Sequence, residues 1–107
     1  MSQKMVAFEK ALVEAVDEGL LMLGESGREV VYFHFKHYYG FTKEDVPSNP
    51  QILVRCLEKI FGLGARAVER DILKSLYRKL GLEYVERKDF DFMEYLNEAR
   101  AQLKEER

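Results

Sequence analysis

Apolar residues recur every three or four positions along most of this chain, and glycines and prolines interrupt the pattern. Such spacing places the apolar side chains on one face of an α-helix. The sequence therefore predicts an all-α fold, a compact bundle of about five helices. The expected helices are 3–23, 26–39, 50–61, 65–80 and 91–104, with a short connector turn at 42–46. With 107 residues, the chain is expected to form a single helical domain, 1–107.

Capping residues set several of the expected helix ends. Ser26 and Glu29 have the spacing of a capping box, in which each side chain accepts a hydrogen bond from the other residue's backbone, so we expect the second helix to begin there. Gly24 is the expected left-handed stop of the first helix. Asp91 and Glu94 have the same spacing and predict the start of the last helix.

Two connecting segments give weaker signals. Pro47 disfavours a helical Val46, so the turn at 42–46 should stay short. Tyr84 and Val85 favour a strand, but the sequence offers no second strand to pair with them. The structure of 83–90 therefore stays open.

The composition excludes several classes of protein. No stretch approaches the length of an apolar membrane span, and the start of the chain has no signal-peptide pattern. The formal net charge of −2 gives no global attraction for nucleic acid or anionic lipid. The single cysteine, Cys56, lies on an apolar face and reads as a small core residue. We expect a soluble, cytoplasmic protein, without a cofactor. The charged fraction of 34% with few amides is typical of thermophiles.

The run Val30 to Phe41 holds six of the thirteen aromatic residues and both histidines. On a helical wheel its apolar residues cover about 200°, which predicts a helix buried on more than one side. His34 falls inside this arc, so we expect a buried histidine that is hydrogen-bonded to a tyrosine hydroxyl or to Glu69. His34 and His37 are the candidate soft metal ligands, but two imidazoles fall short of a complete site.

Phe33 lies outside that arc, beside Glu29, Lys36 and His37. An aromatic side chain with a polar rim has the composition of an interface anchor, and a homodimer is the commonest symmetric assembly. The alternative is that other helices of the same chain cover Phe33. The sequence leaves both open.

Four basic residues follow one another at steps of four in the expected helix 65–80: Arg66, Arg70, Lys74 and Arg78. Tyr77 lies between two of them on the wheel, as in surfaces that bind phosphates and stack bases. Such a ladder could bind an acidic protein or, less readily in an acidic chain, nucleic acid. The simpler interpretation is a solvated face with local ion pairs to Glu69 or Asp71.

Glu69 falls on the apolar side of the same helix and needs a partner there, either as a salt-bridged structural acid or in a ligand pocket. A metal or small-ligand pocket near His34 and Glu69 is therefore a second alternative function. Gly62 and Gly64, before this helix, could receive an anion, but a tight helix–helix turn explains them as well. No catalytic constellation is present, so we do not expect an enzyme.

Several short strings of this chain resemble a small archaeal helical family of unknown function, the Nitrosopumilus output domain. They are Leu23-Gly24-Glu25-Ser26, the aromatic helix ending in Tyr39-Gly40, the acidic connector with its proline, Leu57-Glu58-Lys59-Ile60-Phe61-Gly62 with Gly64-Ala65, Leu80-Gly81-Leu82, and Phe90-Asp91-Phe92. The resemblance covers roughly 19–99 and implies an archaeal, all-α regulatory domain with a signalling partner. It implies no catalytic residue. The first hypothesis is therefore a non-enzymatic interaction module that self-associates.

Overall fold

The computed structural model describes residues 2–105, and no strand occurs among them. The helices are α1 (Gln3–Leu21), α2 (Gly24–Tyr39), the 3₁₀ helix η1 (Lys43–Ser48), α3 (Pro50–Phe61), the 3₁₀ turn η2 (Gly62–Gly64), α4 (Ala65–Leu80) and α5 (Phe92–Glu105). This confirms the all-α bundle with five α-helices. The connector at 42–46 is also helical, as a 3₁₀ helix that continues through Pro47.

The start of α2 differs from the prediction. Gly24 has the expected left-handed backbone, with φ of 81°, but it is the first residue of α2 and not a stop followed by a loop. The capping box at Ser26 and Glu29 is wrong, because α2 begins two residues earlier, at Gly24, so Ser26 lies inside the helix and not at its N-cap. The box at Asp91 and Glu94 is confirmed, since each side chain accepts a hydrogen bond from the other residue's backbone nitrogen, at 2.9 and 2.8 Å.

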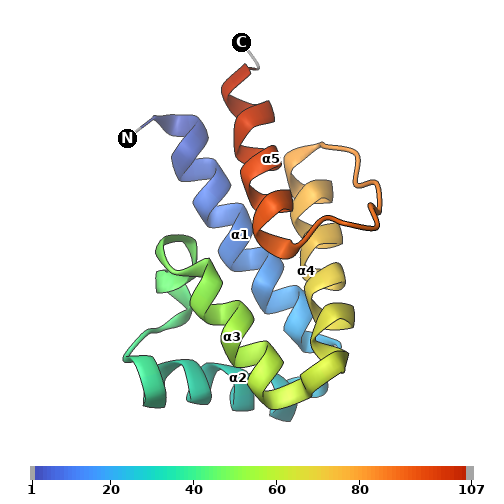
Figure 1. Cartoon of the computed structure of the whole chain (residues 1–107). Helices are drawn as coiled ribbons and strands as arrows, with labels where there is room; N and C mark the ends of the chain where they lie inside the picture. Colours follow the sequence, from blue (N-terminus) through green and yellow to red (C-terminus); the bar gives the residue numbers. More distant parts are fainter. Residues whose placement is uncertain (1, 106–107) are drawn as a thin grey trace.

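Helix α1 packs most extensively against α4 (Figure 1). Helix α2 lies at one end of the molecule, where it packs against α1 and α3. Helix α5 contacts α4, α1 and α3. The fully buried side chains include Phe8, Leu12, Val16 and Leu20 of α1, Val31 and Phe35 of α2, Leu53, Cys56 and Leu57 of α3, Ile72 and Leu76 of α4, and Leu96 of α5.

Gly19 sets how closely α1 and α4 approach. A Cβ atom built at this position would lie 2.5 Å from the Cγ1 of Ile72 and 3.0 Å from its backbone. Such distances are well inside van der Waals contact, so only glycine fits between the two helices. The most extensive helix–helix contact of the bundle therefore depends on one missing side chain.

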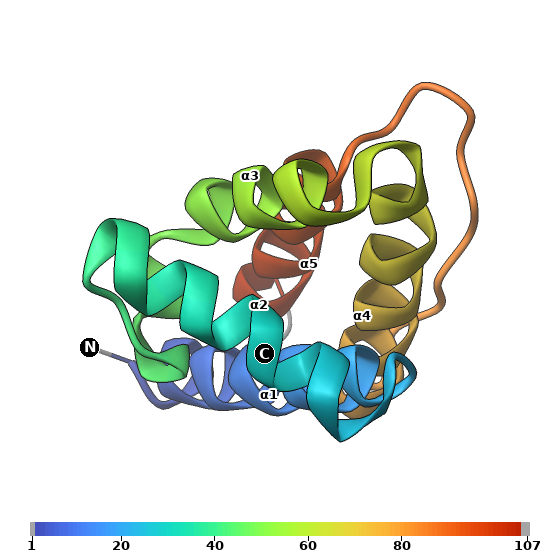
Figure 2. The ribbon, with the colours of Figure 1, turned by 90° about the horizontal axis from the view of Figure 1, so that it is seen from below.

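The 82–91 segment crosses from α4 to α5 as an outer loop (Figure 2). Tyr95 of α5 fixes its course, because the hydroxyl of Tyr95 accepts a hydrogen bond from the backbone nitrogen of Arg87 at 2.7 Å and donates one to the carbonyl of Val85 at 3.1 Å. Arg87 also forms two hydrogen bonds to Glu98, at 2.7 and 2.9 Å. The segment that sequence left open is thus a pinned loop and not a strand.

Candidate interaction surface

Asp17 of α1 binds the side of α2 that faces the bundle, where Val31 and Phe35 are fully buried. Its two carboxylate oxygens accept hydrogen bonds from the Tyr32 hydroxyl at 2.9 Å and from the Arg28 guanidinium at 3.1 Å. Lys43 of η1 comes within 4.0 Å of the same carboxylate. Burial and the Asp17 carboxylate raise the pKa of Tyr32, which keeps its hydroxyl protonated as a donor.

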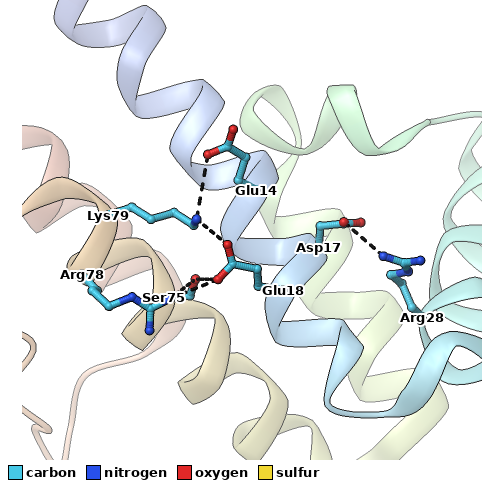
Figure 3. A network of polar contacts seen from close by, with 7 residues as sticks. All are labelled: Glu14, Asp17, Glu18, Arg28, Ser75, Arg78 and Lys79. Atoms are coloured by element: carbon cyan, nitrogen blue, oxygen red, sulfur yellow. Dashed lines mark hydrogen bonds and ion pairs between the residues drawn. The ribbon is translucent and has the colours of Figure 1, made fainter.

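The acids of α1 point to two sides (Figure 3). Asp17 faces Arg28 of α2, whereas Glu18 faces α4. Glu18 accepts hydrogen bonds from Ser75 and from Arg78, each at 3.0 Å, and pairs with Lys79. The hydrogen bond from Lys79 lowers the pKa of Glu18. Neither acid was predicted as a site residue. Each lies next to a position of the apolar stripe of α1, since Asp17 follows Val16 and Glu18 precedes Gly19.

With that side turned inward, the opposite side of α2 stays uncovered. We define the aromatic face of α2 as Val30, Phe33, His34, His37 and Tyr38. Phe33 and Tyr38 are 67% and 65% exposed, and Val30 is also exposed. At 100° per residue these five positions form one continuous arc of about 140°. The expectation that α2 is buried on more than one side is therefore wrong.

The rings of the aromatic face contact one another. Phe33 stacks on His37 at 5.3 Å between ring centroids, His37 meets Tyr38 edge-on at 4.8 Å, and His34 lies 4.5 Å from Tyr38. These contacts restrict the side chains before any partner arrives, which reduces the entropy that binding would cost. Glu29 and Lys36, the other two predicted interface residues, are exposed along one edge of the face.

The prediction of a buried His34 needs correction. His34 is only partly buried, and its contact is the ring of Tyr38 on the same helix. It lines a shallow hollow between α2 and α3 with Tyr38, Tyr39, Arg55 and Lys59. Glu69 lines a different cavity, between α3, α4 and the 82–91 segment, so the two residues predicted to share a pocket do not meet. Within residues 2–105 no three His, Cys, Asp or Glu side chains are grouped to hold a metal ion.

The basic ladder of α4 does not form the expected stacking surface. Tyr77 is only 1% exposed, and its hydroxyl donates to the carbonyl of Tyr95 at 2.7 Å, so it cannot stack on a base. Arg78 pairs with Glu18 of α1 and Arg70 with Glu86 of the loop. These partners come from other parts of the chain and not from Glu69 or Asp71, as the sequence had suggested. Arg66 and Lys74 stay exposed.

Glu69 is half-buried, and its Oε2 atom has no hydrogen-bond partner among the described residues. Burial raises the pKa of this carboxyl to about 7, and the charges of Glu58 and Asp91 act in the same direction, while Arg66 opposes them. The interpretation of Glu69 as a salt-bridged structural acid is therefore wrong among the described residues. Cys56 is fully buried, as expected, and burial raises the pKa of its thiol to about 11.

Comparison of the chain with protein-family models, curated proteins and solved structures finds no match. Among residues 2–105, no helix has the length and apolar character to cross a membrane.

Replacing Asp17 should loosen α2 from the bundle. We expect Asp17→Ala to lower the free energy of unfolding by about 1 to 2 kcal/mol, because Arg28 and the half-buried Tyr32 hydroxyl lose their partner. Urea denaturation measures this change, and hydrogen exchange should show it earliest in the amides of α2. Asp71→Ala is the matched control, since it also removes a mid-helix aspartate, but one without a polar side-chain contact within residues 2–105. Equal stability of the two variants would contradict the role of Asp17.

Proposed function

We propose that this chain is a non-enzymatic interaction module that forms a homodimer through the aromatic face of α2. The observation that carries this proposal is the continuous, uncovered arc centred on Phe33, at the end of the molecule away from the α1–α4 core. Exposed aromatic clusters of this kind are enriched at the centres of protein interfaces. Two such faces stacked on each other would remove the rings of both from water.

The charges beside the face favour a second copy of the same chain as its partner. Glu29 and Lys36 lie at equal distances along α2 from the point between Tyr32 and Phe33, and both flank Phe33. Within residues 2–105 neither forms an ion pair. A two-fold axis at that point would run the two α2 helices antiparallel and bring each Glu29 to the partner's Lys36. The edge of the face is thus complementary to itself in charge.

The proposed role, compartment and source of this module come from its sequence. The resemblance to output domains supports a regulatory role with a signalling partner in the cytoplasm of an archaeon. The high charged fraction supports a thermophilic source. In this proposal a signalling partner recognises or controls dimer formation through α2.

Sedimentation equilibrium of the full chain tests the dimer. We expect a reversible dimer for the wild type and about thirtyfold weaker association for Phe33→Ala, because truncation of a central aromatic anchor typically costs about 2 kcal/mol. Leu63→Ala is the matched control, since Leu63 is 97% exposed but lies on the α3–α4 turn. A wild type that stays monomeric at millimolar concentration would overturn the proposal.

Charge reversals at Glu29 and Lys36 test the antiparallel pairing by the same sedimentation measurement. Glu29→Lys and Lys36→Glu should each weaken the dimer roughly threefold to tenfold, because each substitution places like charges together twice in the symmetric interface. The double variant Glu29→Lys with Lys36→Glu should restore wild-type association. Additive weakening in the double variant would rule out the antiparallel pairing.

A further inference from the structure

A second feature lies away from the aromatic face of α2, in the cavity between α3, α4 and the 82–91 segment. The cavity has a volume of about 370 Å³. Its walls include the aromatic rings of Tyr84, Phe90 and Tyr95, which contact one another at 5.0 to 5.1 Å between centroids. This volume is at the lower end of the range for small-molecule sites. The hydrogen bonds of Tyr95 to the loop hold the cavity open in advance of any ligand.

The floor of the cavity carries an acid without a partner. Oε2 of Glu69 is removed from solvent and accepts no hydrogen bond from any described residue. A buried carboxylate oxygen normally has a donor, because its desolvation is otherwise uncompensated. A ligand that brings a positive charge to the Glu69 carboxylate would offset this cost.

The charges around Glu69 select the sign of that ligand. Glu58 from α3 and Asp91 from the start of α5 also line the cavity, and both act on Glu69 as like charges. Two of the basic side chains at the rim are already neutralised, Arg70 by Glu86 and Arg87 by Glu98. Arg66 and Lys88 form no ion pair within residues 2–105, and Arg66 partly offsets the like charges around Glu69. At Glu69 itself the like charges of Glu58 and Asp91 outweigh Arg66, which favours a positive charge there.

The walls select an organic cation over a metal ion. The three carboxylates are not grouped closely enough to share one metal ion. Aromatic faces attract ammonium and guanidinium groups, and Phe90 already holds the Arg87 guanidinium 4.4 Å from its ring centroid. An apolar stem would lie against Val54, Leu73 and Met93, which also line the cavity.

We propose that this cavity binds a small organic cation, an aliphatic amine or guanidine, whose protonated nitrogen donates to the Glu69 carboxylate while its stem lies against the aromatic walls. The site shares no residue with the aromatic face of α2, so it stands whether or not the chain dimerises. A bound ligand would contact α4, the 82–91 segment and α5 together. A ligand would thereby stabilise the part of the fold that α2 does not touch.

Titration of the full chain with agmatine, followed by amide NMR at pH 8 and constant ionic strength, tests this inference. We expect saturable shifts confined to α4, the 82–91 segment and the start of α5. Glu69→Gln should weaken binding at least tenfold, because it removes the charge while keeping the shape of the side chain. The matched control Glu44→Gln removes an exposed acid of η1 and should bind agmatine as the wild type does.

Three probes distinguish the alternatives in the same experiment. Putrescine should bind the cavity as well, because an ammonium group supplies the same donor and charge. Magnesium chloride and inorganic phosphate should not shift these amides. Absence of saturable binding by agmatine and putrescine, undiminished binding in Glu69→Gln, or equal shifts with magnesium or phosphate would each overturn the proposal.

Discussion

Gly19→Val should destabilise this protein by about 3 kcal/mol, because a side chain at this position overpacks the contact between α1 and α4. The smallest side chain would already place a Cβ atom 2.5 Å from Ile72 Cγ1 and 3.0 Å from the Ile72 backbone. Repacking one side chain cannot relieve a clash with the backbone, so α1 and α4 must separate. Separation opens the most extensive helix–helix contact of the bundle.

The expected drop in melting temperature is about 15 °C, from the usual relation for a domain of this size. Thermal unfolding followed by circular dichroism measures it. Gly19→Ala should also destabilise, although alanine favours a helix by about 1 kcal/mol over glycine. Gly64→Ala is the matched control, because the nearest atom to a Cβ there is 3.8 Å away and its φ is negative. A Gly19→Val protein as stable as the wild type would mean that α1 and α4 are not closely packed in solution.

The helix positions could be predicted because local chemistry determines them. Each of these signals acts on the backbone within a few residues of its own position. They include the apolar spacing, Pro50 at the start of α3, and the left-handed glycines Gly40 and Gly81. The error at Ser26 has the same origin. A capping box is a local signal, and here the backbone conformation of Gly24 starts the helix two residues earlier.

The orientation of α2 could not be predicted, because its apolar residues cover about 200° of the helix, about twice the width of a one-sided stripe, and Phe33 lies outside that arc. A wheel of that kind does not say which side is buried. In the structure the inward side carries the fully buried Val31 and Phe35, and Tyr32 on that side binds Asp17, fifteen positions earlier and on another helix. The sequence therefore left the exposure of Phe33 open, and the structure shows that it is exposed; the wheel placed Val30, His34 and Tyr38 in the core, whereas all three belong to the aromatic face.

The candidate sites on α4 depend on contacts that are distant in the sequence. Tyr77 seemed available beside the basic ladder, but its hydroxyl reaches the carbonyl of Tyr95 and its ring is enclosed by Tyr84 and Tyr95. Glu69 was recognised from its apolar position as an acid that needs a partner. The sequence could not show that its neighbours would be Glu58 and Asp91, which come from α3 and from the loop before α5.

Glu69→Gln should stabilise the protein at pH 8 and leave it almost unchanged at pH 4.5. Burial raises the pKa of the Glu69 carboxyl to about 7, from an ordinary value of 4.5, so the unfolded chain releases this proton first as the pH rises. Below pH 4.5 the group is neutral in both states and costs nothing. Between pH 4.5 and 7 the cost grows, and above 7 it is complete.

The charged groups facing Glu69 modulate this cost without reversing it: Glu58 from α3, Arg66 and Arg70 from α4, and Glu86, Arg87, Lys88 and Asp91 from the loop. With allowance for water that reaches the cavity, we expect a gain of about 2 kcal/mol for Glu69→Gln at pH 8. Urea denaturation of both proteins at pH 4.5, 6 and 8 measures it, and Glu44→Gln should differ from the wild type equally at all three. A Glu69→Gln difference that does not change with pH would contradict the raised pKa. The ionised acid thus costs stability in the free protein, and a cation in the cavity would remove that cost by pairing with it, so agmatine should stabilise the wild type at pH 8 but not the Glu69→Gln protein.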